Sequence, residues 1–377
     1  MPFFDVRHQE RAQRILLRAL AGGRMPHAYI FHGPPGVGKR MLADRLAMRL
    51  LCAAPQAVDP PGGAGGAFAG IPCLDACGRC QDCHTVAAGT HPDLHVIHRD
   101  LREYLKESEA RKRKGIDLGI DIIREFLIDA VGRRPMRGRA KVFIVEEAER
   151  LSDEAQNAML KTLEEPPPTT FIILLTRALD RLLPTTRSRA HPVPFRALPS
   201  DFVEEALRLR RSDLAPGDVA YLARIAEGRL GVAFAYAEDG MLSVKRDVGE
   251  TIATLAPQTV GALAGTLGES AQQFGKRAAA RHEADISDTE ANRIGLRALL
   301  AAVAAFYADA LRCASGATMP PTNADQPHVI EAIVRRHTRR GLTHAIREIV
   351  RAESNIDRSA NVTLTLEALA IRLARCK

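Results

Sequence analysis

A glycine-rich segment, GPPGVGKR at residues 33–40, follows a short apolar run and precedes a helical repeat of apolar residues. It matches the GxxxxGK[ST] loop, in which backbone N–H groups at a helix N-terminus cradle phosphates, through Gly33, Gly36, Gly38 and Lys39. The hydroxyl that should follow the lysine and bind Mg²⁺ is replaced by Arg40, which cannot ligate a metal. We therefore expect impaired Mg-ATP binding and crippled hydrolysis. Three interpretations stay open: a scaffold turn or inert nucleotide site, a slow ATPase, and normal turnover.

An acidic pair follows the apolar run Val142–Val145. Glu146-Glu147 stands where Mg²⁺-dependent phosphate loops have Asp-Glu, so the carboxylate on the metal side is one methylene longer. Glu147 could still orient a water molecule. Together with Arg40, this pair predicts a chain that is not an active ATPase by itself.

Four of the seven cysteines lie between residues 73 and 83. Cys77, Cys80 and Cys83 interleave two CxxC units, a spacing that can direct three thiolates at one tetrahedral Zn²⁺. Four available protein ligands, with no catalytic acid or base nearby, favour a structural metal site over free thiols. Three candidates remain for the fourth ligand: Cys52 at the end of the helix after the phosphate loop, the nearer but geometrically strained Cys73, and His84.

Short apolar, β-prone runs alternate with helical repeats over the first 196 residues. The expected strands are Ala28–His32, Leu94–His98, Val142–Val145 and Phe171–Leu175, with a weaker fifth at HPVPF near residue 195. Helical spacing marks Gln9–Ala21, Ile120–Val131 and Asp153–Leu163. This alternation predicts a parallel sheet covered on both faces. The interval Ala53–Gly70 is rich in Pro, Gly and Ala and offers nothing to bury, so we expect a loop insertion.

Composition narrows the class of protein. A chain of 377 residues should hold two or three domains, and 46% hydrophobic residues exclude wholesale disorder. After about residue 197 every pattern is helical. The net charge of +8 favours polyanionic partners, whereas the absence of Trp disfavours base-stacking platforms. No apolar stretch reaches about 18 uninterrupted residues, and the N-terminus lacks a signal-peptide pattern, so we expect a soluble, cytoplasmic protein without a membrane partner.

Four motifs together resemble the bacterial clamp-loader members of the AAA+ family. They are the phosphate loop, the cysteine cluster followed by AGTHPD (Ala88–Asp93), KVFIVEEAERLSDEAQNAMLKTLEEPP (Lys141–Pro167) and TTRSRA (Thr185–Ala190). The resemblance covers the first 196 residues well, and the rest by helical pattern and by the stretch ANVTLTLEALAIRL. It implies an α/β AAA+ domain over 1–196 with a zinc module at about 52–84. A small helical lid over 197–243 and an all-helical collar over 244–377 would follow.

In this family the zinc module occurs in an ATPase motor subunit and in a subunit whose own nucleotide site is degenerate. Arg40 and Glu146 make the chain similar to the degenerate type. The motors also carry a sensor arginine in the lid, and Gly231 stands at that position here.

The resemblance also implies a residue given to a neighbour. In the family a Ser-Arg-Cys motif projects an arginine into the ATP site of the adjacent subunit, and Ser188-Arg189-Ala190 stands in its place. A guanidinium that reaches the γ-phosphate in trans stabilises charge in the transition state. Arg189 is therefore the expected arginine finger, with Arg187 as the second candidate.

The implied partners are the motor (gamma/tau) and delta subunits in a hetero-oligomeric ring, and through that ring the sliding clamp and primed DNA. Two alternatives remain. One is the motor ATPase of the same complex, and the other is a zinc-dependent DNA-binding module.

Overall fold

Five parallel strands form the sheet of the N-terminal unit in this computed structural model. The structure describes residues 3–63, 66–107, 117–137, 140–256, 258–281, 287–357 and 361–375. They divide into two compact units, Met1–Ala197 and Leu198–Lys377. The strand order is β4-β5-β6-β1-β7, and the four pairings are parallel. The strands are β1 (Ala28–His32), β4 (Leu94–Ile97), β5 (Lys141–Val145), β6 (Thr170–Thr176) and β7 (His191–Pro194). The expected parallel sheet is confirmed, including its weak fifth strand.

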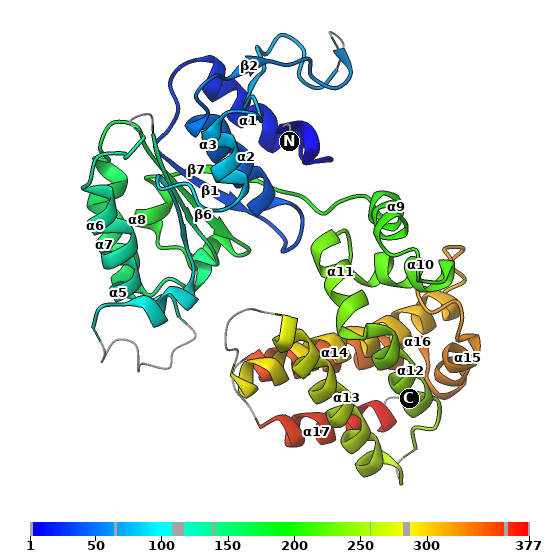
Figure 1. Cartoon of the computed structure of the whole chain (residues 1–377). Helices are drawn as coiled ribbons and strands as arrows, with labels where there is room; N and C mark the ends of the chain where they lie inside the picture. The colour runs from blue at the N-terminus through cyan, green and yellow to red at the C-terminus, as the bar shows by residue number, and fades with distance from the viewer. Residues whose placement is uncertain are drawn as a thin grey trace. The chain divides into compact units, whose positions relative to one another are not determined.

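Helices cover both faces of this sheet (Figure 1). One face carries α1 (Glu10–Ala21), α2 (Lys39–Leu51) and α3 (Gln81–Ala87), and the other carries α5 (Ile120–Ile123), α6 (Asp129–Val131) and α7 (Asp153–Glu164). Side chains alternate between the faces, so Ile30 of β1 joins the core under α5 and α7 while Tyr29 and Phe31 point the other way. The helix expected over 120–131 contains a π-helical turn at Arg124–Ile128.

The interval Ala53–Gly70 differs from the expectation. Gln56–Ala57 (β2) pairs antiparallel with Leu74–Asp75 (β3). Phe68 is only 3% exposed, and its ring centroid lies 4.9 Å from that of Phe4. The prediction that this segment buries nothing is therefore wrong, because one aromatic side chain anchors it to the N-terminal 3-10 turn Phe3–Asp5. Residues 64 and 65 lie outside the described residues.

Every regular element among the described residues of the second unit is a helix. Its helices are α9 (Ser200–Arg210), α10 (Pro216–Ile225), α11 (Leu230–Asp239), α12 (Met241–Ala253), α13 (Val260–Arg281), α14 (Asp288–Ala314), α15 (Pro327–Arg336), α16 (Arg339–Asp357) and α17 (Val362–Arg375). α14 is long and apolar enough to cross a membrane by length and composition, but 61% of its apolar window is buried inside the unit. It contacts α13 and α16, as a core helix does. The division into a lid over 197–243 and a collar over 244–377 stays a prediction.

Candidate phosphate site and metal centre

The phosphate loop connects β1 to α2. Three of its glycines have left-handed backbones, with φ of 139° at Gly33, 71° at Gly36 and 99° at Gly38. A Cβ at Gly33 would lie 2.3 Å from the carbonyl oxygen of Phe195. Gly33 N–H donates to the Thr176 carbonyl of β6 (3.3 Å), which joins the loop to the sheet. The loop therefore depends on glycine for both its turn and its close approach to the chain after β7.

The Lys39 side chain folds back onto its own loop. Its Nζ donates to the carbonyl oxygens of Gly33 and Pro34, each at 2.6 Å. Burial lowers the pKa of Lys39 to about 8, while the Glu149 carboxylate opposes this shift. Lys39 thus remains mostly charged at neutral pH and contacts loop carbonyls at the N-terminus of α2.

Arg40 occupies the first turn of α2, where the GxxxxGK[ST] pattern has its metal-binding hydroxyl. Its Nε donates to Asp44 Oδ1 at 2.8 Å, and its Nη1 pairs with Glu146 Oε1. Burial disfavours the charged guanidinium, but Asp44 and Glu146 together raise the pKa of Arg40. Because Mg²⁺ takes oxygen ligands and guanidinium offers none, these residues do not fit a Mg²⁺ ion.

Glu147, the expected water-orienting carboxylate, follows β5 with a left-handed backbone (φ 46°). Its carboxylate lies 3.4 Å from Arg150 Nε and 3.9 Å from Arg99 Nε. Positive φ at a non-glycine residue is strained, and such strain often accompanies function. The structure therefore places Glu147 beside two arginines, and its water-orienting role stays a prediction.

Four cysteines converge beside the C-terminus of α2. Cys52 is the C-cap residue of α2, Cys80 is the N-cap residue of α3, and Cys83 lies within α3. With Cys77, their sulfurs all lie within 4.8 Å of one another. The Cys52 sulfur is 3.6 Å from that of Cys77 and 3.9 Å from that of Cys80. A tetrahedral Zn²⁺ with Zn–S bonds of about 2.3 Å holds its sulfurs about 3.8 Å apart, so the cluster fits this ion.

Backbone amides stabilise thiolate character in this cluster. Amide hydrogen bonds, first from Arg79 and then from Cys80, lower the pKa of the Cys77 thiol to about 6. Burial raises the pKa of Cys52 and Cys83, which favours their neutral thiols in the absence of a cation. A metal ion is the charge that would hold all four as thiolates.

Of the three candidates for the fourth position, the structure brings Cys52 to the other cysteines. The Cys73 thiol instead donates to the carbonyl of Ile71 (3.2 Å), and neither Cys73 nor His84 belongs to the described cluster.

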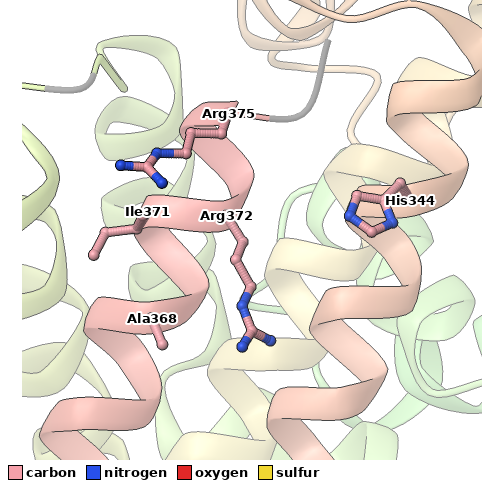
Figure 2. Close-up of a pocket in the computed structure, with 5 residues that line it drawn as sticks. All are labelled: His344, Ala368, Ile371, Arg372 and Arg375. Carbon is pink, nitrogen blue, oxygen red and sulfur yellow. The ribbon is translucent and has the colours of Figure 1, made fainter.

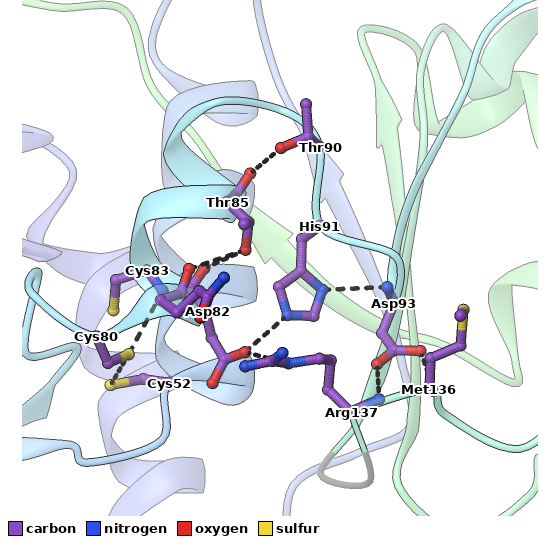
Figure 3. Close-up of polar contacts among 11 residues, drawn as sticks. Cys52, Cys80, Asp82, Cys83, Thr85, Thr90, His91, Asp93, Met136 and Arg137 are labelled. Atoms are coloured by element: carbon purple, nitrogen blue, oxygen red, sulfur yellow. Dashed lines mark hydrogen bonds and ion pairs between the residues drawn. The ribbon is translucent and has the colours of Figure 1, made fainter.

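A polar network beside the cluster was not foreseen from the sequence (Figure 3). His91 Nδ1 accepts from the Asp93 N–H (3.1 Å), which places its ring proton on Nε2, 3.5 Å from Asp82 Oδ1. Asp82, on α3, also accepts from Arg137 Nε at 2.8 Å. The network thus links α3, which contains Cys83, to the segments that enter β4 and β5. The sequence feature that points to this network is the AGTHPD motif, which contains His91 and Asp93.

The expected arginine finger lies between α8 (Pro184–Arg187) and β7. Arg189 has a side chain that is 32% exposed, and it forms an ion pair with Glu164 at the end of α7. Its Nη1 also donates to the Thr185 carbonyl at 2.9 Å. Arg187, the second candidate, is exposed. In the helical unit, Gly231 lies in the first turn of α11.

A small cavity of about 340 Å³ lies between α16 and α17 (Figure 2). One of its arginines, Arg372, pairs with Glu348 of α16. None of its five lining residues is among the site residues expected from the sequence: His344, Ala368, Ile371, Arg372 and Arg375.

A phosphate loop after β1, flanked by β6 and β7 in a parallel sheet with helices on both faces, defines a P-loop module of the AAA+ type. This module carries a cluster of four cysteines that could hold a metal ion, and it precedes a helical unit. A family model described as DNA polymerase III, delta subunit, matches residues 8–199, about half of the chain. A second, described as the C terminal of that subunit, matches residues 290–375. The chain therefore belongs to the DNA polymerase III delta subunit family, which confirms the resemblance found in the sequence.

Curated relatives are named either as the delta' subunit or as the gamma/tau or tau subunit of DNA polymerase III. DNA polymerase III subunit delta' of Pseudomonas aeruginosa is 38% identical over 192 residues, 49% of this chain and 50% of the relative. The delta' subunit of Escherichia coli is 35% identical over 46% of this chain and 43% of its own length. DNA polymerase III subunit tau of E. coli is 32% identical over 70% of this chain and 36% of its own length. The chain thus spans half or less of these relatives.

Proposed function

We propose that this chain acts as the delta-prime subunit of a bacterial DNA polymerase III clamp loader. It would help to place the sliding clamp on primed DNA without hydrolysing ATP itself. The observation that carries this proposal is Arg40, which stands at the metal-hydroxyl position and pairs with Glu146. Relatives named delta' support it. Gly231 at the place of the family's sensor arginine points the same way.

The proposed partners are the motor (gamma/tau) and delta subunits in a hetero-oligomeric ring in the cytoplasm. Residues 1–196 would form the AAA+ domain, 197–243 a lid, and 244–377 an oligomerisation collar. Contact with the clamp and with primed DNA would come through the complex.

The proposed contribution to hydrolysis is the guanidinium of Arg189. Its pair with Glu164 is partly solvent-exposed, with side chains 32% and 47% exposed. Exposed ion pairs contribute little stability, so the guanidinium can exchange Glu164 for a neighbour's γ-phosphate at small cost. An arginine supplied in trans is worth several kcal/mol of transition-state stabilisation in other NTPases.

The experiment is reconstitution of the full chain with motor and delta subunits, followed by ATPase measurement with clamp and primed DNA. Arg189→Ala should leave assembly intact, as judged by size-exclusion chromatography, and lower hydrolysis at the adjacent site by about tenfold or more. Arg189→Lys should also fail to restore full activity, because an ammonium lacks the planar fork of guanidinium.

Arg187→Ala is the matched control, since it removes an exposed arginine two residues away. Full activity of Arg189→Ala would remove the finger proposal. Loss confined to Arg187→Ala would transfer the role to Arg187.

We propose that the cysteine cluster binds a structural Zn²⁺ through Cys52, Cys77, Cys80 and Cys83. The support is the sulfur geometry, which fits a tetrahedral ion. Cys73 would be the alternative to Cys52, but its thiol is bonded elsewhere.

The second candidate function is the motor ATPase, which the tau relative favours. It requires turnover by the purified chain that Lys39→Ala abolishes. Absence of turnover in the purified chain would leave the delta-prime proposal standing.

A further inference from the structure

Arg40 joins the two positions between which a phosphate-loop protein holds its metal. One position is the residue after Lys39 at the start of α2, and the other is the first carboxylate after β5. Here the guanidinium of Arg40 spans them directly by pairing with Glu146, although 106 residues separate the two in sequence.

Asp44 completes this arrangement. It lies one helical turn after Arg40, and its Oδ1 accepts from Arg40 Nε at 2.8 Å. Burial raises the pKa of Asp44, and the neighbouring guanidinium counteracts that shift. The Arg40 guanidinium therefore lies between two partly buried carboxylates. It supplies the positive charge that a metal ion would otherwise supply.

A guanidinium and Mg²⁺ cannot share this place. Mg²⁺ requires near-octahedral oxygen ligands at about 2.0 to 2.1 Å, whereas guanidinium offers only donors and stays protonated. Glu146 Oε1 already accepts from Arg40 Nη1, so this carboxylate is paired with the guanidinium.

We propose that Arg40 replaces the magnesium ion of this phosphate loop, so that the site excludes divalent cations and any nucleotide it takes is bound without metal assistance. This inference deepens the proposed function and rests on it, because it treats the loop as a nucleotide site that has lost catalysis. Two features would then exclude the metal: the Arg40 guanidinium, which occupies its place, and the absence of the hydroxyl that would ligate it.

The test is binding of a fluorescent ATP analogue (mant-ATP) to the full, zinc-loaded chain in Mg²⁺ and in EDTA. The unmodified chain should gain no affinity from Mg²⁺. Arg40→Thr restores the hydroxyl and frees Glu146, so Mg²⁺ should tighten its binding by about tenfold or more. The double variant Arg40→Thr with Glu146→Gln should lose that gain.

The proposal would be overturned if the unmodified chain bound mant-ATP tenfold more tightly in Mg²⁺ than in EDTA. It would also be overturned if Arg40→Thr folded but bound mant-ATP equally well with and without Mg²⁺. If that variant does not fold, the unmodified chain and Glu146→Gln decide through Mn²⁺ binding measured by electron paramagnetic resonance with ATP. Absence of bound Mn²⁺ in both chains supports metal exclusion. Mn²⁺ bound by the unmodified chain contradicts it, and loss of that Mn²⁺ in Glu146→Gln would assign the ion to Glu146. Because these readouts do not involve the ring, failure of the Arg189 experiment leaves their result standing.

Discussion

Asp93 fixes the segment before β5 through two backbone hydrogen bonds (Figure 3). Asp93 is fully buried (0% exposed). Its two carboxylate oxygens accept hydrogen bonds from the N–H groups of Met136 (2.7 Å) and Arg137 (2.8 Å). Asp93→Ala leaves both amides without their acceptor. We expect it to lower the free energy of unfolding of the N-terminal unit by about 3 kcal/mol, measured by urea denaturation.

Two further variants separate this role from a general surface effect. Asp93→Asn retains one carbonyl oxygen as acceptor and should lose less stability than Asp93→Ala. Asp100→Ala removes a side chain that is 39% exposed, and it should change stability by less than about 0.5 kcal/mol. An Asp93→Ala variant as stable as Asp100→Ala would contradict the proposed role of Asp93.

At this scale the sequence predicts which residues matter better than it predicts their partners. AGTHPD was recognised as a motif, but Arg137, whose N–H bonds to Asp93, is 44 positions away in sequence. Arg40 and Glu146 were each recognised as departures from a pattern. Their pairing depends on the order of strands in the sheet, which no local pattern encodes. Cys52 stayed one of three candidates for the same reason.

Two glycines allow α13 and α14 to pack with their backbones in close approach. A Cβ at Gly295 of α14 would lie 1.7 Å from the Ala271 carbonyl oxygen, and one at Gly275 of α13 would lie 2.1 Å from that of Ala291. Gly295→Ala must push the helices apart. We expect a loss of about 3 kcal/mol in the stability of the helical unit, measured by thermal unfolding with circular dichroism.

Gly265→Ala is the matched control because Gly265 lies on α13, is exposed, and has nothing within 4 Å of its added Cβ. Alanine favours a helix by about 0.8 to 1.0 kcal/mol over glycine, so this variant should be more stable than the unmodified chain. Equal effects of the two substitutions would show that helix propensity, rather than the close packing of α13 and α14, determines the change in stability.

The elements themselves were largely predictable. β1 has the expected bounds, and β4, β5 and β6 differ by one or two residues at their ends, because buried parallel strands are continuous apolar runs. β7 was weak because it contains Pro192 and Pro194, which an edge strand tolerates. The π-helical turn and the close contact of α13 with α14 were not predictable, since both arise from packing.

At the scale of the whole molecule, the proposed metal site belongs to one unit. The four clustered cysteines lie within Met1–Ala197, whereas α13 to α16 belong to Leu198–Lys377. Binding of a structural metal contributes directly to folding free energy. Removal of zinc by a chelator should therefore increase hydrogen exchange across residues 52–91 and leave α13 to α16 unchanged, as measured by mass spectrometry on the full chain.

Cysteine variants connect this effect to the cluster rather than to the chelator. Cys80→Ser removes a central member of the cluster and should reproduce the exchange pattern of the chelated chain, with its zinc content lost. Cys73→Ser should keep about one zinc per chain, because the Cys73 thiol bonds to Ile71 and lies outside the cluster. Zinc absent from the unmodified chain would refute the metal site. Exchange that rose equally in both units would refute its confinement to the N-terminal unit, because stability that a metal supplies to one unit is lost first from the segments it holds together.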